Sequence, residues 1–512
     1  MPSKLFSATT YGMEGRIIEV EVDTSPGHAV FNTVGLPDTA VKEAKDRVTS
    51  ALKNSGYRPP YAFGHVTVNL APADLKKEGP AFDLPIALGI LAASNQISTL
   101  PNRAIFLGEL ALDGRLRRIK GVLPIAMSVR EKGFDSIFLP ADVASEANIV
   151  DDLRVYPVKT LKELVDHLLG INLLKPLSKT ENFLAKLGEE EYDHDFAFIK
   201  GQEHVKRALE IAVAGGHNIL LSGPPGSGKT MLAKSIPSIM PPLTREEVFE
   251  VTKLYSIAGL TTSDQPVVTK RPYRAPHHSA SAVSLVGGGA FPRPGEISLA
   301  NRGVLFLDEF PEFSREVIEN LRQPLEDGQV LISRAQGSIT FPARFILIAA
   351  MNPCPCGNAT DPEKQCTCHP GQIARYRAKL SGPIMDRIDL HIEVPRLKFE
   401  KLAKNELSEP SAEIRKRVLA TRERQKKRFS GEKRTRRVVT NAEMDGKLIR
   451  QYCAIGNQEK ALLKAAISKF GLSPRGYHRL LKVARTIADL EGSTDIKTEH
   501  LAEAIQYRFK ED

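Results

Sequence analysis

The chain has 512 residues, a formal net charge of +10 and a hydrophobic content of 42%. This length suggests about three domains, and the apolar content suffices for hydrophobic cores. The positive charge favours an anionic partner, most often nucleic acid, although many basic proteins bind none. No apolar run approaches the roughly 18 residues that a membrane helix needs, and the first residues lack a signal-peptide core. We therefore expect a cytoplasmic protein without a membrane partner.

The first third of the chain, residues 1–172, alternates strand-like and helix-like patterns, which predicts an α/β or α+β domain. The predicted strands cover residues 16–22, 63–70, 104–110 and 136–139, and the predicted helices cover 38–54, 84–94 and 125–132. A charged stretch comes next, and we interpret residues 173–195 as a solvated linker.

An apolar run over residues 218–221 predicts a strand, and a glycine-rich segment follows it directly. The segment matches the pattern G-x-x-x-x-G-K-[ST], whose backbone N–H groups cradle phosphates at the start of a helix. We expect Lys229 to reach the β- and γ-phosphates of ATP, and the Thr230 hydroxyl to hold Mg²⁺. The alternative is a glycine-rich turn that binds nothing. The predicted nucleotide-binding residues are Gly223, Pro224, Pro225, Gly226, Ser227, Gly228, Lys229 and Thr230.

Two further predicted strands end in polar residues. The apolar run 303–307 is followed by Asp308 and Glu309, which suit the Mg²⁺ shell and the polarisation of an attacking water, respectively. Acidic residues at a strand end are also common as solvated caps, so the order along the chain carries this assignment. The run 344–350 precedes Asn352, whose amide can orient the water; the alternative is a turn-forming asparagine.

Four of the five cysteines form two close pairs, Cys354 with Cys356 and Cys366 with Cys368. Two such pairs separated by a short polar loop suit tetrahedral Zn²⁺. The site would be structural, because four protein ligands leave no open position. Free thiols or a redox pair are the alternatives, and Cys453 stands alone.

The nucleotide-binding domain is predicted to span residues 196–395. It contains a polar insert with His277 and His278 that is too long for a simple crossover, and residues 329–341 read as a β-hairpin. Residues 396–512 read as helices without strands, and this part carries strongly basic stretches. These stretches are residues 415–417, 422–428 and 433–437.

Together these motifs resemble the magnesium-chelatase-like AAA+ ATPases of the YifB/ComM group. The resemblance covers nearly the whole chain, and its most specific marks include PHHSAS, GVLFLDEF, AAMNPCPCG and SGPIMDRIDLHIEVP. It implies an α/β multidomain fold: a Lon-protease-like (S5-like) α/β domain, a P-loop AAA+ domain of three layers, and a C-terminal helical lid. It also implies a homo-oligomeric ring, expected to be a hexamer.

The resemblance implies roles for two arginines. Arg387 would be an arginine finger that reaches the γ-phosphate of a neighbouring subunit, and Arg475 would be the lid arginine that senses nucleotide. Both roles need a planar donor that is always charged. Either arginine can instead be a surface ion-pair partner.

By the same resemblance, the polar insert and the hairpin point into the central pore of the ring. The candidate DNA contacts are His277, His278, Arg334 and Gln336. Such loops would grip phosphates without reading sequence, so binding should weaken with salt. A polar pore loop can also grip a polypeptide, and a histidine pair can simply pack.

The N-terminal domain resembles the S5-like domain of Lon proteases around Gly79–Leu84 and Gly108–Arg115. Its catalytic positions are changed, because Ala81 replaces the nucleophilic serine and Leu123 aligns with the activating lysine. A hydroxyl next to an amine base is the minimum for this chemistry. Lys120 lies three residues before Leu123, and it could take the position of the activating lysine only if the alignment were shifted by three residues. We therefore do not expect peptidase activity.

The leading hypothesis is a ring-forming, ATP-dependent DNA motor. It would be a branch-migration helicase that aids integration of DNA in natural transformation and recombination. The alternative is a chelatase-type remodeller in which ATP turnover acts on a partner protein.

Overall fold

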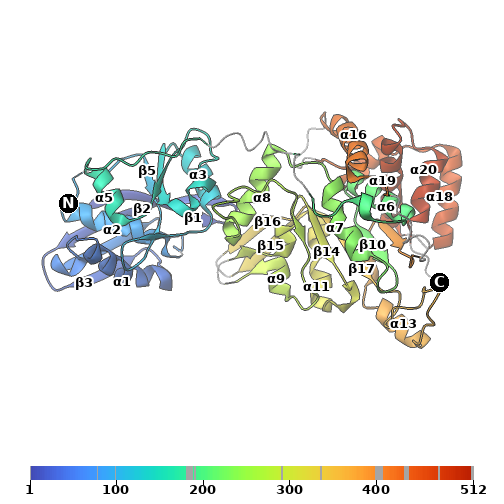
Figure 1. The fold of residues 1–512 in the computed structure, drawn as a ribbon, viewed down its shortest axis with the longest axis horizontal. Coiled ribbons are helices and arrows are strands. Elements are labelled where there is room, and N and C mark those ends of the chain that lie inside the picture. Colours follow the sequence, from blue (N-terminus) through green and yellow to red (C-terminus); the bar gives the residue numbers. More distant parts are fainter. Residues whose placement is uncertain are drawn as a thin grey trace. The chain divides into compact units, whose positions relative to one another are not determined.

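The computed structural model describes residues 2–77, 79–98, 100–179, 188, 192–289, 292–334, 337–397, 407–431, 438–470 and 473–508. Contacts between Cα atoms divide the chain into two compact units. The first comprises residues 1–186 and 245–268, and the second comprises residues 187–244 and 269–512. Each unit is described separately below (Figure 1).

The first unit contains a mixed sheet with the strand order β3-β4-β2-β1-β5-β8-β9. The strands β1 and β4 pair antiparallel with β2, and the other neighbours pair in parallel. Their bounds are β1 (Ser3–Tyr11), β2 (Glu14–Ser25), β3 (Val30–Val34), β4 (His65–Ala71), β5 (Ala104–Phe106), β8 (Ser136–Pro140) and β9 (Arg154–Val158). A separate two-stranded ribbon joins β6 (Glu109–Leu110) and β7 (Leu116–Arg117).

The prediction of one strand over 104–110 is wrong, because the chain leaves the large sheet after Phe106. The N–H of Gly108 donates to the carbonyl of Ala81 at 2.9 Å instead of joining a ladder, and the carbonyl of Gly108 accepts from Leu84 at 3.0 Å. Residues 109–110 then pair in the ribbon.

Helices cover both faces of this sheet. Successive strand residues point to opposite faces, and Ile105 and Phe106 accordingly belong to two separate apolar clusters. One cluster includes residues of α1 (Thr39–Asn54), α2 (Asp83–Ala93) and α5 (Leu161–Leu168). The other includes residues of α3 (Val122–Glu131) and α4 (Ala141–Ala147).

The helix α8 (Arg245–Ala258) belongs to the first unit, although it follows the phosphate loop in the sequence. It packs against α3, and a buried carboxylate ties the two segments together. Glu146 accepts hydrogen bonds from the Leu123 N–H at 2.7 Å, from the Thr261 hydroxyl at 2.7 Å and from the Ser256 hydroxyl. Burial raises the pKa of this carboxyl group. Residues 245–268 therefore lie outside the unit that holds the rest of the predicted domain 196–395.

The second unit is built on a parallel sheet with the order β11-β14-β17-β10-β18. Its strands are short, and the three central ones, β14, β17 and β10, are almost entirely apolar, as expected for a sheet that is covered on both faces. Their bounds are β10 (Ile219–Ser222), β11 (Tyr273–Arg274), β14 (Val304–Leu307), β17 (Ile346–Met351) and β18 (Leu390–Glu393). The predicted hairpin is confirmed, because β15 (Gln329–Arg334) pairs antiparallel with β16 (Gly337–Pro342). A second ribbon joins β12 (Gly287–Gly288) and β13 (Arg293–Pro294).

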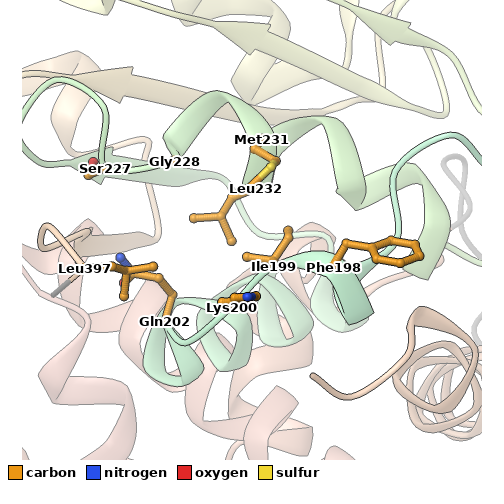
Figure 2. A pocket seen from close by; sticks show the side chains of 9 residues that line it. All are labelled: Phe198, Ile199, Lys200, Gln202, Ser227, Gly228, Met231, Leu232 and Leu397. Carbon is orange, nitrogen blue, oxygen red and sulfur yellow. The ribbon is translucent and has the colours of Figure 1, made fainter. Parts of the chain in front are cut away.

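The helices of the α/β part of this unit include two that flank the phosphate loop, α6 (Glu203–Gly215) and α7 (Lys229–Ile239). A cavity lies between the segment that precedes α6 and the start of α7 (Figure 2). The described residues of this part also form α9 (Ala282–Val286), α10 (Glu296–Leu299), α11 (Arg315–Asn320), α12 (Arg322–Asp327), α13 (Pro370–Arg377) and α14 (Gly382–Met385).

The C-terminal part is helical in the ranges that the structure describes. It contains α16 (Ser411–Phe429), α17 (Gly446–Tyr452), α18 (Asn457–Phe470), α19 (Pro474–Leu490) and α20 (Thr498–Gln506). These helices share one apolar cluster with β10, β14 and β17, so they are part of the core that supports the phosphate loop. No helix among the described residues has the length and apolar character needed to cross a bilayer.

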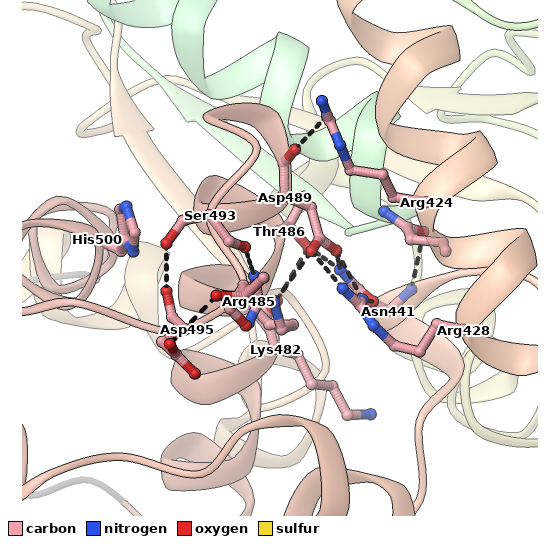
Figure 3. Close-up of polar contacts among 12 residues, drawn as sticks. Arg424, Arg428, Asn441, Lys482, Arg485, Thr486, Asp489, Ser493, Asp495 and His500 are labelled. Atoms are coloured by element: carbon pink, nitrogen blue, oxygen red, sulfur yellow. Dashed lines mark hydrogen bonds and ion pairs between the residues drawn. The ribbon is translucent and has the colours of Figure 1, made fainter.

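A buried ion network holds α16 to α19 (Figure 3). Asp489 is 1% exposed, and its carboxylate accepts from Arg428 at 2.7 Å, from Asn441 at 2.8 Å and from Arg485 at 3.1 Å. The Arg424 guanidinium donates to the Asp489 carbonyl at 2.6 Å. Two of the basic side chains of α16, Arg424 and Arg428, therefore bind groups inside the protein.

We predict that Asp489→Ala destabilises the helical part by about 3–5 kcal/mol, because it leaves the buried Arg485 without its carboxylate partner. Thermal unfolding of the full chain measures this change. The exposed Glu499→Ala is the matched control and should change stability by less than about 1 kcal/mol. Equal melting temperatures for the two variants would contradict the prediction.

Candidate nucleotide-binding active site

The phosphate loop runs from the end of β10 to the start of α7, which begins at Lys229. Gly226 and Gly228 have φ angles of 77° and 90°, a region that side chains with a Cβ rarely adopt. A Cβ at Gly223 would come within 2.2 Å of the Val394 carbonyl oxygen. These glycines allow the loop to fold tightly, and glycine-rich loops of this type bind phosphates through their backbone N–H groups.

Lys229 lies in this loop with only 8% of its surface exposed. Its Nζ donates to the carbonyls of Gly223 at 2.7 Å and Pro224 at 2.9 Å, and it lies 3.3 Å from Asn352 Oδ1. Burial lowers the pKa of the amine, and two nearby carboxylates oppose this shift. The ammonium group thus has neutral partners that the phosphates of a nucleotide can replace.

Thr230 and Asp308 meet at the same place. The Thr230 hydroxyl donates to Asp308 Oδ2 at 2.8 Å, and the other carboxylate oxygen accepts the Glu309 N–H at 2.9 Å. They meet because β10 and β14 both pair in parallel with β17, so their carboxyl ends share one sheet edge. A hydroxyl and a carboxylate are hard oxygen ligands, and they fit Mg²⁺ bound next to phosphates.

Glu309 adopts a left-handed backbone conformation with φ of 52°, which is uncommon for a residue other than glycine. Its carboxylate lies 3.1 Å from His278 Nδ1. The His278 ring also stands edge-on to Phe313, with ring centroids 6.5 Å apart, and its centroid lies 4.1 Å from that of His277. One of the candidate DNA contacts is therefore also a neighbour of the candidate catalytic carboxylate.

The cavity beside the phosphate loop has a volume of about 290 Å³. Its lining is mainly apolar and comes from the segment before α6, from α7 and from residue 397 (Figure 2). This position and lining suit the planar base of a nucleotide. The lining residues are Phe198, Ile199, Lys200, Gln202, Ser227, Gly228, Met231, Leu232 and Leu397. The sequence argument identified only Ser227 and Gly228 of this lining, because the other residues match no motif and meet only through folding.

The two arginines that were expected to act on phosphate lie together. Arg387 donates to the Pro383 carbonyl at 2.7 Å and to one oxygen of Glu326, and Arg475 lies 3.2 Å from the other oxygen. Arg387 is 9% exposed. It precedes β18, and β18 is parallel to β10, so Arg387 lies at the sheet edge opposite the phosphate loop. The structure therefore does not bring these arginines to the Lys229 site of their own chain.

The remaining candidate DNA contacts are described only in part. His277 is exposed, and its Nδ1 lies 2.8 Å from the Ser279 hydroxyl oxygen. Arg334 ends β15, but its side chain and the whole of Gln336 lie outside the described residues. The contact of these four residues with DNA stays a prediction.

The four clustered cysteines converge. The sulfur of Cys354 lies 3.4 Å from that of Cys356 and 3.7 Å from that of Cys366, and the N–H of Cys356 donates to Cys368 Sγ. All four sulfurs lie within 4.8 Å of one another. Thiolates around Zn²⁺ at about 2.3 Å stand roughly 3.8 Å apart, so this donor set fits that ion.

The cysteine loop lies against the phosphate loop. Gly357 has φ of 83°, and a Cβ there would come within 2.5 Å of Pro225 Cδ. The cysteine loop also follows Asn352 closely in the sequence, because only Pro353 separates Asn352 from Cys354. A metal bound by the cysteines would therefore fix the segment that carries Asn352.

Models of the magnesium chelatase subunit ChlI match three successive parts of the chain. The model of subunit ChlI of Mg-chelatase matches residues 20–143, that of magnesium chelatase, subunit ChlI, matches 195–402, and that of its C-terminal part matches 408–508.

Known proteins also match along almost the whole chain. Competence protein ComM of Haemophilus influenzae is 45% identical over 98% of this chain and 97% of its own length. YifB of Escherichia coli is 44% identical over 97% and 95%, and Rv2897c of Mycobacterium tuberculosis is 40% identical over 99% and 98%. The predicted family is thus confirmed: this chain belongs to the magnesium-chelatase ChlI-like AAA+ proteins of the ComM/YifB family.

Proposed function

We propose that this protein is a ring-forming AAA+ ATPase that couples ATP hydrolysis to the movement of branched DNA. The assignment of ATP binding and hydrolysis rests on one observation. Four polar residues meet at the carboxyl ends of the parallel strands: Lys229, Thr230, Asp308 and Asn352. The ComM relative, named a competence protein, and the net charge of +10 support the DNA part. The physiological process would be branch migration during integration of DNA in natural transformation and recombination.

In this proposal the loop N–H groups and the start of α7 bind the phosphates of ATP. Lys229 leaves the loop carbonyls and binds the β- and γ-phosphates, while Thr230 and Asp308 hold the metal shell. Mg²⁺ neutralises charge that develops on the phosphates. Glu309 polarises the attacking water, and Asn352 orients it.

The arginine pair acts on the nucleotide of the adjacent subunit. Arg387 and Arg475 share Glu326 at the sheet edge opposite their own phosphate loop, which supports action across a subunit boundary. A guanidinium at that place stabilises charge on the transferred phosphoryl group. We infer a closed ring, a hexamer by family resemblance, with His277, His278, Arg334 and Gln336 facing its pore. The N-terminal unit, which matches the model of subunit ChlI over residues 20–143, would be a scaffold or DNA-contact surface.

The second candidate is a protein remodeller that drives a partner protein by ATP turnover. The match of all three parts to a magnesium chelatase subunit favours it. The two candidate functions use the same ATPase site. They differ in the molecule that the pore binds, which is DNA in the first and a polypeptide in the second.

ATPase rates with and without forked DNA separate them. We expect forked or single-stranded DNA to raise the rate several-fold, and the effect to fall steeply between about 50 and 200 mM salt. An unfolded polypeptide at matched mass is the control. Stimulation by the polypeptide alone would replace the DNA motor with the remodeller.

Lys229→Ala should weaken ATP binding by roughly 100-fold, because a hydrogen bond to a charged phosphate contributes about 3 kcal/mol. Titration with a fluorescent ATP analogue measures this loss. Lys234→Ala, an exposed lysine on the same helix, is the matched control and should bind normally. If Lys229→Ala bound ATP with the affinity of the native protein, the assignment of the phosphate loop as the ATP-binding site would be wrong.

Arg387→Ala should leave ATP affinity intact and lower turnover of the assembled ring about 10³-fold, since arginine fingers act on the transition state. Arg387→Lys should not restore the rate, because lysine lacks the planar fork. Mixing Arg387→Ala with Lys229→Ala subunits should recover activity, since some interfaces then combine an intact finger with an intact loop. No recovery in assembled mixed rings would count against action across the boundary.

We further propose that Cys354, Cys356, Cys366 and Cys368 hold a structural Zn²⁺. Elemental analysis should find one zinc per chain in the native protein and none in Cys366→Ser/Cys368→Ser. Cys453→Ala should keep its zinc, because that cysteine lies outside the cluster. Because the cysteine loop packs on Pro225, zinc removal should also weaken ATP binding. Metal-free protein with normal stability and ATP affinity would overturn this assignment.

A further inference from the structure

Residues 245–268, which we call the arm, belong to the first unit although the chain on both sides of them belongs to the second. The phosphate-loop helix α7 ends at Ile239, and the arm begins with α8 at Arg245. Residues 240–244 alone therefore connect the helix that carries Lys229 to a segment of the other unit. We call these five residues the connector.

The connector is short and held in place. It contains Pro241 and Pro242, and the ring of a proline fixes its backbone φ angle. Met240 is 4% exposed and belongs to the core cluster of the second unit. The guanidinium of Arg271, which follows the arm, donates to the carbonyl of Pro241 and to that of Pro242 at 3.1 Å. We therefore expect the connector to transmit a displacement of α7 to the arm.

The end of α8 and the turn after it bind a buried carboxylate of the first unit. Glu146 is 3% exposed, and it accepts from the Ser256 hydroxyl and from the Thr261 hydroxyl at 2.7 Å. The N–H of Leu123 donates to Glu146 at 2.7 Å, and the N–H of Gly121 donates to the Ser256 carbonyl at 3.0 Å. Exchange of these two amide protons with solvent therefore reports whether the arm is docked.

The rest of the arm is also in contact with the first unit. The helix α8 has 14 residues, so it is about 21 Å long at 1.5 Å per residue. Phe249 on this helix and Val267 near the end of the arm both pack against the apolar cluster that includes residues of α3 and α4. The arm is thus docked at several points along its length, and its attachment does not depend on one hydrogen bond.

Phosphate binding at the start of α7 would fix this helix, and the connector with it. An arm whose base is already fixed loses less conformational freedom when it docks, so its docking becomes more favourable. Such a coupling is equal in both directions, because the docked arm must strengthen nucleotide binding by the factor by which nucleotide strengthens docking.

We propose that the arm makes the first unit responsive to nucleotide. ATP at the phosphate loop stabilises the arm in its docked position around Glu146, and the docked arm in turn strengthens ATP binding. This regulation rests on the proposed ATP site, and it is independent of whether the protein acts on DNA or on a polypeptide.

Hydrogen–deuterium exchange of the full-length protein measures both ends of the coupling in one experiment. A saturating non-hydrolysable ATP analogue with Mg²⁺ should slow exchange of the α7 amides, because it binds there. It should also slow exchange of residues 121–123 by about fivefold, the lower end of ordinary coupling between two sites. Lys229→Ala at the same analogue concentration is the control for binding and should show much weaker effects at both places.

The first variant weakens docking. Ser256→Ala/Thr261→Val removes the two hydroxyls that donate to Glu146 and keeps the side chains of similar size. It should keep the protection of α7, lose the effect of the analogue at residues 121–123 and bind ATP about fivefold more weakly. Ser263→Ala removes an exposed hydroxyl from the same arm, and this matched control should behave as the native protein does.

The second variant leaves the arm and Glu146 unchanged. Pro241→Gly/Pro242→Gly keeps the two carbonyls that accept from Arg271 but loosens the connector, because glycine has much more backbone freedom than proline. The analogue should still protect α7 in this variant and should no longer slow exchange at residues 121–123.

The outcomes separate the coupling from the ATP site. If the analogue protects α7 in the native protein while residues 121–123 exchange at an unchanged rate, the coupling is wrong and the ATP site stands. If neither segment is protected, the ATP site is wrong and the coupling fails with it. If Pro241→Gly/Pro242→Gly retains the full effect at residues 121–123, transmission through the connector is wrong.

Discussion

The candidate site depends on the parallel pairing of five short strands. Parallel strands carry their carboxyl ends to one edge, so the loops after β10, β14 and β17 meet there. This register places residues of three separate segments within hydrogen-bonding distance. Lys229 lies close to Asn352, and the adjacent Thr230 donates to Asp308. The apolar strands beneath them are buried on both faces, and the C-terminal helices share that core.

The same edge receives two loops that belong to no phosphate-binding motif. The insert after β11 brings His278 to Glu309, and the cysteine loop after β17 brings Gly357 to Pro225. The first loop carries the exposed His277, and the second carries the four clustered thiols. Two loops outside the phosphate-binding motif therefore contact the candidate ATPase site.

The opposite edge of the sheet carries the arginine pair. Arg387 and Arg475 share one carboxylate, although one residue precedes β18 and the other begins a C-terminal helix. Arg479 of that helix adds a 2.6 Å ion pair to Asp389, which secures the helix to the start of β18. A sheet with the phosphate loop at one edge and arginines at the other suits subunits arranged head to tail in a ring.

The sequence by itself determined the phosphate loop, the acidic pair after its strand, the hairpin and the family, because these depend on local order and periodicity along the chain. It missed β1, and it could not show that residues 245–268 join the N-terminal unit, since their partner Glu146 lies a hundred residues earlier. Only the tertiary structure decided that His278 meets Glu309, that Glu326 holds both arginines and that a cavity adjoins Ser227. Such contacts are set by strand order and loop packing, and sequence spacing does not encode them.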